Sequence, residues 1–282
     1  MGTDGYLLVA GALAPAIVLM IYIYKKDKSE KEPVRLLLSL FVLGAVSCYP
    51  AAGAERLVGE IIYDIFVGIR QATGADVTVL NYIYKAVDNV IGIALVEEGA
   101  KLLVLYLITG KNKNFNSLFD GLIYSVFVSL GFAALENVNY ALSYGWKTVA
   151  IRAIVSVPGH MFFGVIMGYG YTMWHMAKKA QTVERVMRDG GYIGGGASRI
   201  STGAYFAKGF IFAVLAHGFF DFCLSFDTTA ATVIFYAFVA VMYFFCFRSI
   251  SKLSKNDTSD FGAAFSLVLQ KYPDAAIPPE WM

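Results

Sequence analysis

Charged residues are scarce in this chain. Asp, Glu, Lys and Arg make up 16% of its 282 residues, whereas 57% are hydrophobic, and the mean hydropathy is +0.59. This balance excludes an ordinary water-soluble domain, in which about 25% of residues are charged. The formal net charge of +2 is too small to suggest a protein that binds nucleic acid, and the basic residues do not form one stripe.

Cysteine is also scarce. The three cysteines, Cys48, Cys223 and Cys246, each lie within an apolar segment. Three thiols at these spacings match neither an extracellular disulfide framework nor the paired cysteines of a zinc site. The H-E-x-x-H pair of many zinc proteases is absent as well.

Long apolar segments are what the chain has in abundance. About 20 apolar residues cross the hydrocarbon core of a bilayer, so we expect seven spans, near residues 6–24, 35–52, 87–109, 118–144, 149–177, 206–226 and 229–247. The predicted fold is all-α: a polytopic transmembrane helix bundle forming a single membrane domain over residues 1–282. Basic residues follow the first, third, fifth and seventh spans. They place this multi-pass protein in the cell membrane with its amino terminus outside and its carboxyl terminus in the cytoplasm.

Three segments do not fit a span. Residues 53–86 carry charged side chains together with apolar ones at helical spacing, which predicts an amphipathic helix on the outer membrane interface. Residues 178–205 contain five glycines between positions 190 and 196, which predict a mobile cytoplasmic loop. Residues 248–282 should form a cytoplasmic tail with a small surface helix. Gly164 and Gly168 form a G-x-x-x-G pair, which is typical of a contact between helices.

Ionisable side chains interrupt several of the apolar segments. Such a group costs about 3 kcal/mol on insertion scales, so it is a candidate for a functional site. Counted from the predicted outer end of each span, Glu97 lies about ten residues in, Glu136 about eight, His160 about eleven and His217 about nine. These four groups should therefore share one layer and face each other, because lipid cannot satisfy them.

The spacing within each helix adds partners to this layer. Lys101 follows Glu97 by four residues and shares its face, so it can neutralise part of the charge of Glu97 and Glu98. Asp221 follows His217 by one turn and can accept a hydrogen bond from a histidine, which fixes the tautomer. Adjacent residues on a helix point about 100° apart, so only one of the two glutamates need face the layer.

Four short motifs carry these residues in order: Glu97-Glu98-Gly-Ala-Lys101, Phe132-Ala-Ala-Leu-Glu136-Asn137, His160 alone, and His217-Gly-Phe-Phe-Asp221. In this order the chain resembles the PrsW family of intramembrane proteases. It is more distantly similar to the CAAX prenyl endopeptidase and bacteriocin-processing superfamily, but carries Glu136 where that superfamily has a histidine. The resemblance covers about residues 87–226, the expected catalytic core. It implies a protease in contact with membrane lipid that cuts single-span or otherwise membrane-anchored proteins, such as an anti-sigma factor in stress signalling.

The mechanism that we favour from the sequence needs no cofactor. Glu97 aligns with the first glutamate of the family motif and would act as the general base toward water, while Glu98 shares its proton or holds a neighbouring backbone group. His160 and His217 would stabilise the oxyanion, with Asn137 as a further donor. The sequence leaves open which of Glu97 and Glu98 is the base.

Two alternatives remain. In a zinc-dependent protease, Glu136, His160 and His217 would be the ligands, because two imidazoles and one carboxylate hold zinc in several hydrolytic sites, and Glu97 would again be the base. A proton- or cation-coupled transporter would also use Glu, His and Asp inside the membrane. Against the transporter, the sequence has no inverted repeat and no matched pair of broken helices.

Overall fold

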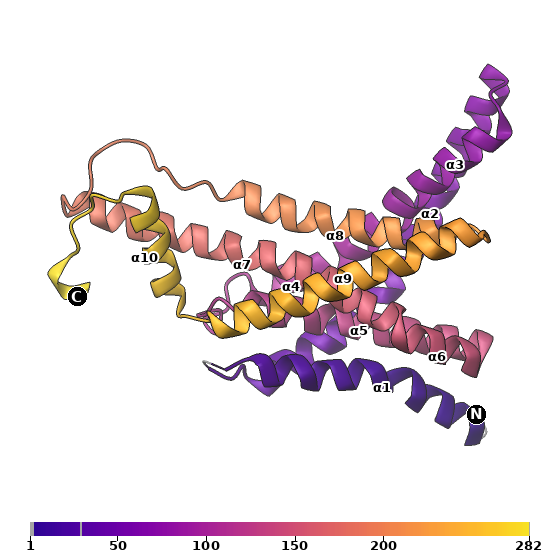
Figure 1. Ribbon diagram of the computed structural model, residues 1–282, viewed down its shortest axis with the longest axis horizontal. Coiled ribbons are helices and arrows are strands. Elements are labelled where there is room, and N and C mark those ends of the chain that lie inside the picture. Colours follow the sequence, from indigo (N-terminus) through magenta and orange to yellow (C-terminus); the bar gives the residue numbers. More distant parts are fainter. Residues whose placement is uncertain (1–2, 29, 282) are drawn as a thin grey trace.

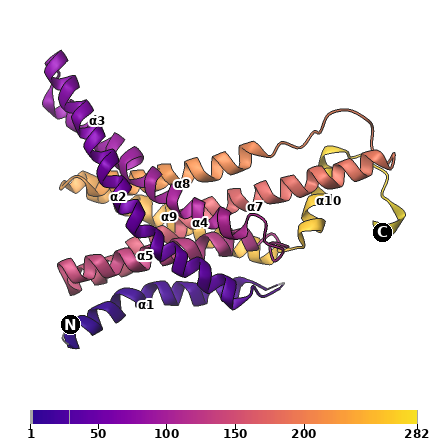
Figure 2. The same cartoon turned by 180° about the vertical axis from the view of Figure 1, so that it is seen from behind.

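The computed structural model describes residues 3–28 and 30–281. Within these ranges the regular structure is helical, and there is no β-strand. Six helical segments are long and apolar enough to cross a membrane. Most of them run along the long axis of an elongated bundle, whereas the helix of residues 34–73 crosses the others obliquely (Figures 1 and 2). The first helix begins at the opposite end of the molecule from the segment that follows residue 271 (Figure 1). The predicted all-α polytopic bundle is confirmed.

Each expected span is helical. The six candidate membrane segments are α1 (Thr3–Lys26), α2 (Val34–Thr73), α5 (Asp120–Tyr144), α6 with α7 (Trp146–Ile154 and Ser156–Asp189), α8 (Gly203–Leu224) and α9 (Thr229–Lys255). The seventh expected span, 87–109, is not among these six segments. It consists of a π-helix, η1 (Asp88–Ala94), and α4 (Leu95–Thr109), which together continue α3 (Val77–Val87). The chain closes with α10 (Asp260–Lys271) and a 3-10 turn, η2 (Pro279–Trp281).

Helix α5 is at the centre of the bundle, and most of its residues are buried. Small residues allow its neighbours to approach. A Cβ on Gly44 of α2 would lie 2.2 Å from the carbonyl oxygen of Val128, and a Cβ on Gly164 of α7 would lie 2.6 Å from Ser129 Oγ. A Cβ on Gly168 of α7 would lie 2.8 Å from Gly121 O of α5. The G-x-x-x-G pair is therefore a helix contact, as predicted.

Residues 53–86 differ from the expected separate interfacial helix. Helix α2 continues unbroken through this segment to Thr73 and ends where Gly74 adopts a left-handed backbone (φ 63°) and donates to Arg70 O at 3.0 Å. Many helices end at a residue with a left-handed backbone, and no residue of α2 before Gly74 adopts that conformation. Helix α3 then returns along α2, with Tyr84 packed against Phe66. Figures 1 and 2 show this hairpin projecting from the bundle.

The expected loop 178–205 is shorter than predicted, because α7 continues to Asp189 and leaves only residues 190–202 outside helices. Its last turns pack against α10 through buried apolar residues such as Val183 and Met187. Glu184 is fully buried and accepts from the Arg199 backbone N–H at 3.2 Å. Likewise α9 continues to Lys255, into the expected tail. Both helices extend beyond their apolar segments because packing against other elements stabilises their last, more polar turns.

Candidate active site

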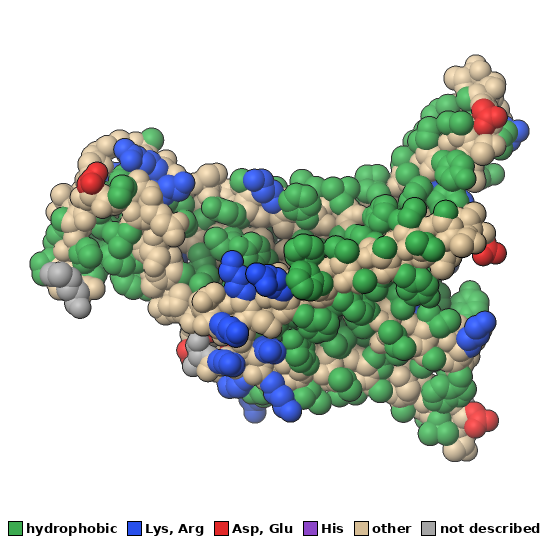
Figure 3. Space-filling model, viewed as in Figure 1, with side chains coloured by type: hydrophobic (Ala, Val, Ile, Leu, Met, Phe, Trp, Pro, Cys, Tyr) green, Lys and Arg blue, Asp and Glu red, His purple; other side chains and the backbone are tan. Residues whose placement is uncertain are grey.

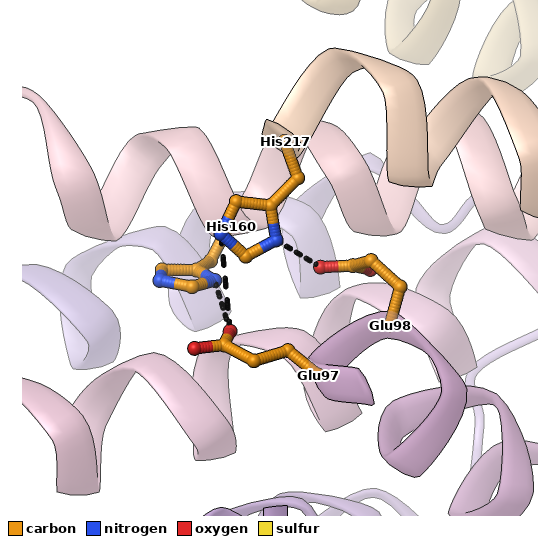
Figure 4. A group of neighbouring side chains, drawn as sticks. All are labelled: Glu97, Glu98, His160 and His217. Atoms are coloured by element: carbon orange, nitrogen blue, oxygen red, sulfur yellow. Dashed lines mark hydrogen bonds and ion pairs between the residues drawn. The ribbon is translucent and has the colours of Figure 1, made fainter. Parts of the chain in front are cut away.

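The ionisable side chains of the apolar segments meet at one level of the bundle. The exposed fractions of Glu97, His160 and His217 are 6%, 4% and 3%. These three side chains line a cavity of about 520 Å³. Figure 4 shows Glu97, Glu98, His160 and His217 pointing toward one another. The full set comes from four helices: Glu97, Glu98 and Lys101 on α4, Glu136 on α5, His160 on α7, and His217 with Asp221 on α8.

A π-helix and a glycine bring α8 against the helix that carries the glutamates. The π-helix η1 ends three residues before Glu97, and π-helical turns occur frequently at functional sites. A Cβ on Gly218 would lie 2.7 Å from Val90 Cγ2 and 2.9 Å from Val90 Cα, closer than atoms can pack. Gly218 therefore permits an approach of α8 to η1 that any larger residue would prevent. This approach places His217 opposite Glu98.

Lys101 is surrounded by acceptors. Its Nζ donates to Glu97 Oε2 at 3.0 Å, to Glu98 Oε1 at 2.8 Å and to His160 Nδ1 at 3.0 Å. The ammonium group also lies 4.2 Å from the centre of the Phe132 ring. The side chain is only 1% exposed. The contact with Glu97 is the one that the four-residue spacing predicts.

Glu136 lies behind His160 and not among the other glutamates. Because an ammonium group can only donate, His160 Nδ1 accepts from Lys101, and the ring proton is on Nε2. Nε2 donates to Glu136 Oε2 at 2.9 Å. The same oxygen lies 2.7 Å from a terminal nitrogen of Arg152 on α6. Glu136 thus fixes the tautomer and orientation of His160.

Arg152 is a functional candidate that sequence reasoning did not place at the site. Its Nε donates to Asn137 Oδ1 at 3.1 Å, and Asn137 Nδ2 donates to Ala12 O of α1 at 2.8 Å. Asn137 is fully buried and does not line the cavity. We therefore expect it to support Arg152, and not to donate to a reacting carbonyl. The signal was present, because Arg152 interrupts an apolar segment just as Glu136 does.

His217 lies between carboxylates. Its Nδ1 is 2.9 Å from Glu98 Oε1, and its Nε2 is 3.2 Å from Asp221 Oδ2 and 3.9 Å from Glu97 Oε2. The ring stacks on Phe163 with a centroid distance of 4.6 Å. Both ring nitrogens are thus held in place, and Asp221 lies where it can accept from the histidine.

One ligand atom from each of Glu97, Glu98, His160 and His217 lies within 4.8 Å of the other three. Two imidazoles with carboxylates are the donor set of hydrolytic zinc sites. Glu136 is not in this group; its Oε2 lies against Arg152 and His160 Nε2. The ligand set expected from the sequence therefore differs from the one that the structure brings together, which has Glu97 and Glu98 in place of Glu136.

The charge of the site also fits a dication. With both histidines neutral, as metal ligands are, the four carboxylates Glu97, Glu98, Glu136 and Asp221 exceed the two cations Lys101 and Arg152 by two charges. Glu98 Oε2 is buried and has no hydrogen-bond partner among the described residues. A buried carboxylate oxygen without a donor is costly unless a cation or a proton satisfies it.

The cavity extends from this layer toward one end of the bundle. Its lining continues beyond Glu136 to Asn139 and Tyr140 on α5, and beyond His217 to Leu224 on α8. In the topology predicted from basic residues, this is the outer end of the bundle. Polar side chains along this path would allow water to reach the buried carboxylates.

These features define a class: a polytopic membrane protein with a buried cluster of glutamates and histidines at the level of its apolar spans. The chain belongs to the PrsW family, because the model of the PrsW family intramembrane metalloproteases matches residues 32–247. This match includes every candidate residue of the site. No solved structure matches the chain.

Curated relatives named Protease PrsW have similar sequences. The protein from Geobacillus kaustophilus is 33% identical over 162 residues, which is 57% of this chain and 64% of the relative. The protein from Clostridioides difficile is 29% identical over 248 residues, 86% of this chain and 88% of the relative. The protein from Bacillus subtilis is 29% identical over 164 residues. The chain thus aligns with slightly less than two thirds of the Geobacillus protein.

Proposed function

We propose that this protein is an intramembrane endopeptidase that hydrolyses a peptide bond of a membrane-anchored protein. The observation that carries the proposal is the convergence of Glu97, Glu98, His160 and His217 beside a cavity within the apolar bundle. Costly ionisable groups gathered at one buried point indicate chemistry more than packing. The family membership supports the same activity.

Glu97 is the better candidate for the general base. It lines the cavity, whereas Glu98 is fully buried behind Lys101 and His217. Glu97 would take a proton from water as the water oxygen bonds to the peptide carbonyl carbon. It would then give that proton to the amine nitrogen as the carbon–nitrogen bond breaks. In the metal-free version, His217 would stabilise the negative charge that develops on the carbonyl oxygen.

The donor set favours a zinc-dependent version of this reaction over the metal-free version expected from the sequence. His160, His217 and Glu98 would hold the ion, which leaves Glu97 as the base. A bound zinc ion supplies Lewis acidity toward the peptide carbonyl. The family description as metalloproteases agrees with this choice. Glu136 and Asp221 would act by orienting the two imidazole rings.

Cleavage in liposomes tests the activity. The purified full chain would be reconstituted with a labelled single-span protein, and its products followed by gel electrophoresis. We expect cleavage by the wild type and by Glu60→Gln, since Glu60 is exposed on α2 and outside the cavity. Glu97→Gln should abolish it. Ion flux without cleavage would instead support the transporter alternative.

Metal analysis of the same preparations tests the zinc hypothesis. We expect about one zinc ion per chain in the wild type, as for other catalytic zinc sites. His217→Ala should lose both the metal and the activity. Full activity of a zinc-free preparation in the presence of chelator would contradict the zinc hypothesis and support the metal-free mechanism.

The substrate proposal is a membrane-anchored anti-sigma factor, the class that the family resemblance suggests. Comparison of membrane proteomes from cells that express the wild type or Glu97→Gln would identify proteins that accumulate only without activity. An anti-sigma factor should be among them. If the accumulating proteins include none, the substrate is of another class.

A further inference from the structure

A second cavity lies between α7, α8 and α9. Its volume is about 510 Å³, within the usual range of ligand sites, and it shares no lining residue with the active-site cavity. Its walls are apolar and largely aromatic, with Phe162, Phe212 and Phe245 among the lining residues. We call it the α8–α9 groove.

The shape of the groove follows from one close helix contact. A Cβ on Gly170 of α7 would lie 2.5 Å from Gly209 Cα of α8, so these two backbones touch and the floor has no side chains there. Toward the far end, Phe219 of α8 packs edge-on against Phe238 of α9 at 4.9 Å. Between Lys208 and Ala216 the groove follows α8 for about 12 Å at 1.5 Å per residue.

One end of the groove is basic. Lys208 and Ser249 line it there, and Arg248 and Lys252 line the neighbouring depression on α9. Lys208 is exposed and makes no ion pair with the residues that the structure describes. In Figure 3 the basic side chains gather toward the end of α9 nearest α10, whereas the surface over the middle of α8 and α9 is hydrophobic.

We propose that the α8–α9 groove binds an anionic phospholipid, with an acyl chain in the apolar channel and the phosphate at Lys208 and Ser249. Basic pockets between transmembrane helices recognise anionic headgroups, and an unpaired lysine at the end of an apolar channel matches both parts of such a lipid. The groove lies between helices that are long and apolar enough to cross the membrane. At that depth the molecules available to fill an apolar channel are lipid chains or apolar helices.

A substrate helix is the competing occupant, and charge argues against it. In the predicted topology the basic end of the groove is cytoplasmic, and the flanks of membrane helices on that side carry Lys and Arg. Those side chains would face Lys208, Arg248 and Lys252, and contacts between like charges disfavour a partner. An anionic headgroup meets the same three residues with opposite charge.

Native mass spectrometry tests the headgroup. The full chain would be purified in detergent and given equal amounts of phosphatidylglycerol and phosphatidylcholine. We expect preferential retention of phosphatidylglycerol. Lys208→Gln should reduce this preference about fivefold, which corresponds to about 1 kcal/mol per basic residue. Lys113→Gln is the matched control, because Lys113 is exposed in the loop after α4 and outside the groove.

Equal retention of the two lipids by the wild type would overturn the proposal, and so would an equal loss in Lys208→Gln and Lys113→Gln. Photocrosslinking identifies the occupant directly. A benzoylphenylalanine at position 212, in place of the exposed Phe212 in the groove wall, should give a phospholipid adduct in liposomes that also contain the single-span protein. Crosslinking to the protein instead would assign the groove to a substrate helix.

Discussion

Gly218→Ala should disable the site without touching any ionisable residue. The new Cβ would lie 2.9 Å from Val90 Cα, whereas ordinary contacts begin near 3.4 Å. The clash is with backbone, so α8 must retreat from η1 by roughly 0.5 to 1 Å, at a cost of about 1 to 3 kcal/mol. His217 moves with it and loses its 2.9 Å contact with Glu98. A displacement of about 1 Å at a catalytic group lowers rates up to about 100-fold.

The assay is the cleavage rate of the single-span protein in liposomes, together with the thermal unfolding temperature. Gly99→Ala is the control, because Gly99 lies between Glu98 and Lys101 yet has nothing within 4 Å of an added Cβ. We expect Gly218→Ala to lose most activity and Gly99→Ala to keep it. Wild-type rates in Gly218→Ala, or equal losses in both variants, would refute the packing argument.

Three further predictions follow from single contacts. Arg152→Met should lower the cleavage rate about 10- to 100-fold with little change in KM. The reason is that Glu136 loses the partner that orients it toward His160. An unchanged cleavage rate would show that the ion pair between Arg152 and Glu136 is dispensable. Lys101→Met should slow the loss of zinc to chelators. The Lys101 ammonium group contacts an oxygen of Glu98 and Nδ1 of His160, two of the atoms that would hold the zinc ion, so the two cations compete. Faster loss of zinc would show that Lys101 supports the metal. Burial raises the pKa of Glu32, in the loop before α2, from 4.5 to about 8. A raised carboxyl pKa contributes stability that is fully present below the unfolded value and is lost as pH rises through about 8. Glu32→Gln should therefore flatten the fall of the unfolding temperature across this window, and an unchanged pH dependence would contradict the assignment.

The sequence predicted the helices and the convergence of polar groups because both follow from the membrane environment. A long apolar segment can cross a bilayer only as a helix or as part of a closed barrel. Side chains such as Glu97 and His160 need polar partners at the same depth, so counting along each span was enough to align them. The contact of Lys101 with Glu97 depends only on helix periodicity, so it could be predicted from the sequence in the same way.

Other features depend on tertiary packing and were not accessible. The π-helix before Glu97 lies where α8 approaches at Gly218, and nothing in the local sequence predicts it. The partner of Glu136 could not be assigned, because Arg152 belongs to a short helix whose position follows from the reversal at Gly145. Glu136 contacts Arg152 and His160 Nε2 and is not in the metal-ligand group. The length of α2 was missed because the sequence between the expected end of the span, at residue 52, and Gly74 contains no clear signal that ends a helix.

The most direct test of the central claim is cleavage of the single-span protein in water enriched in oxygen-18, with both product termini mapped by mass spectrometry. We predict a new carboxyl terminus that lies within the substrate's membrane span and contains one atom of oxygen-18. This product should be absent with Glu97→Gln. A cut confined to an extramembrane loop, or the same labelled product from Glu97→Gln, would contradict hydrolysis at the buried Glu97 site.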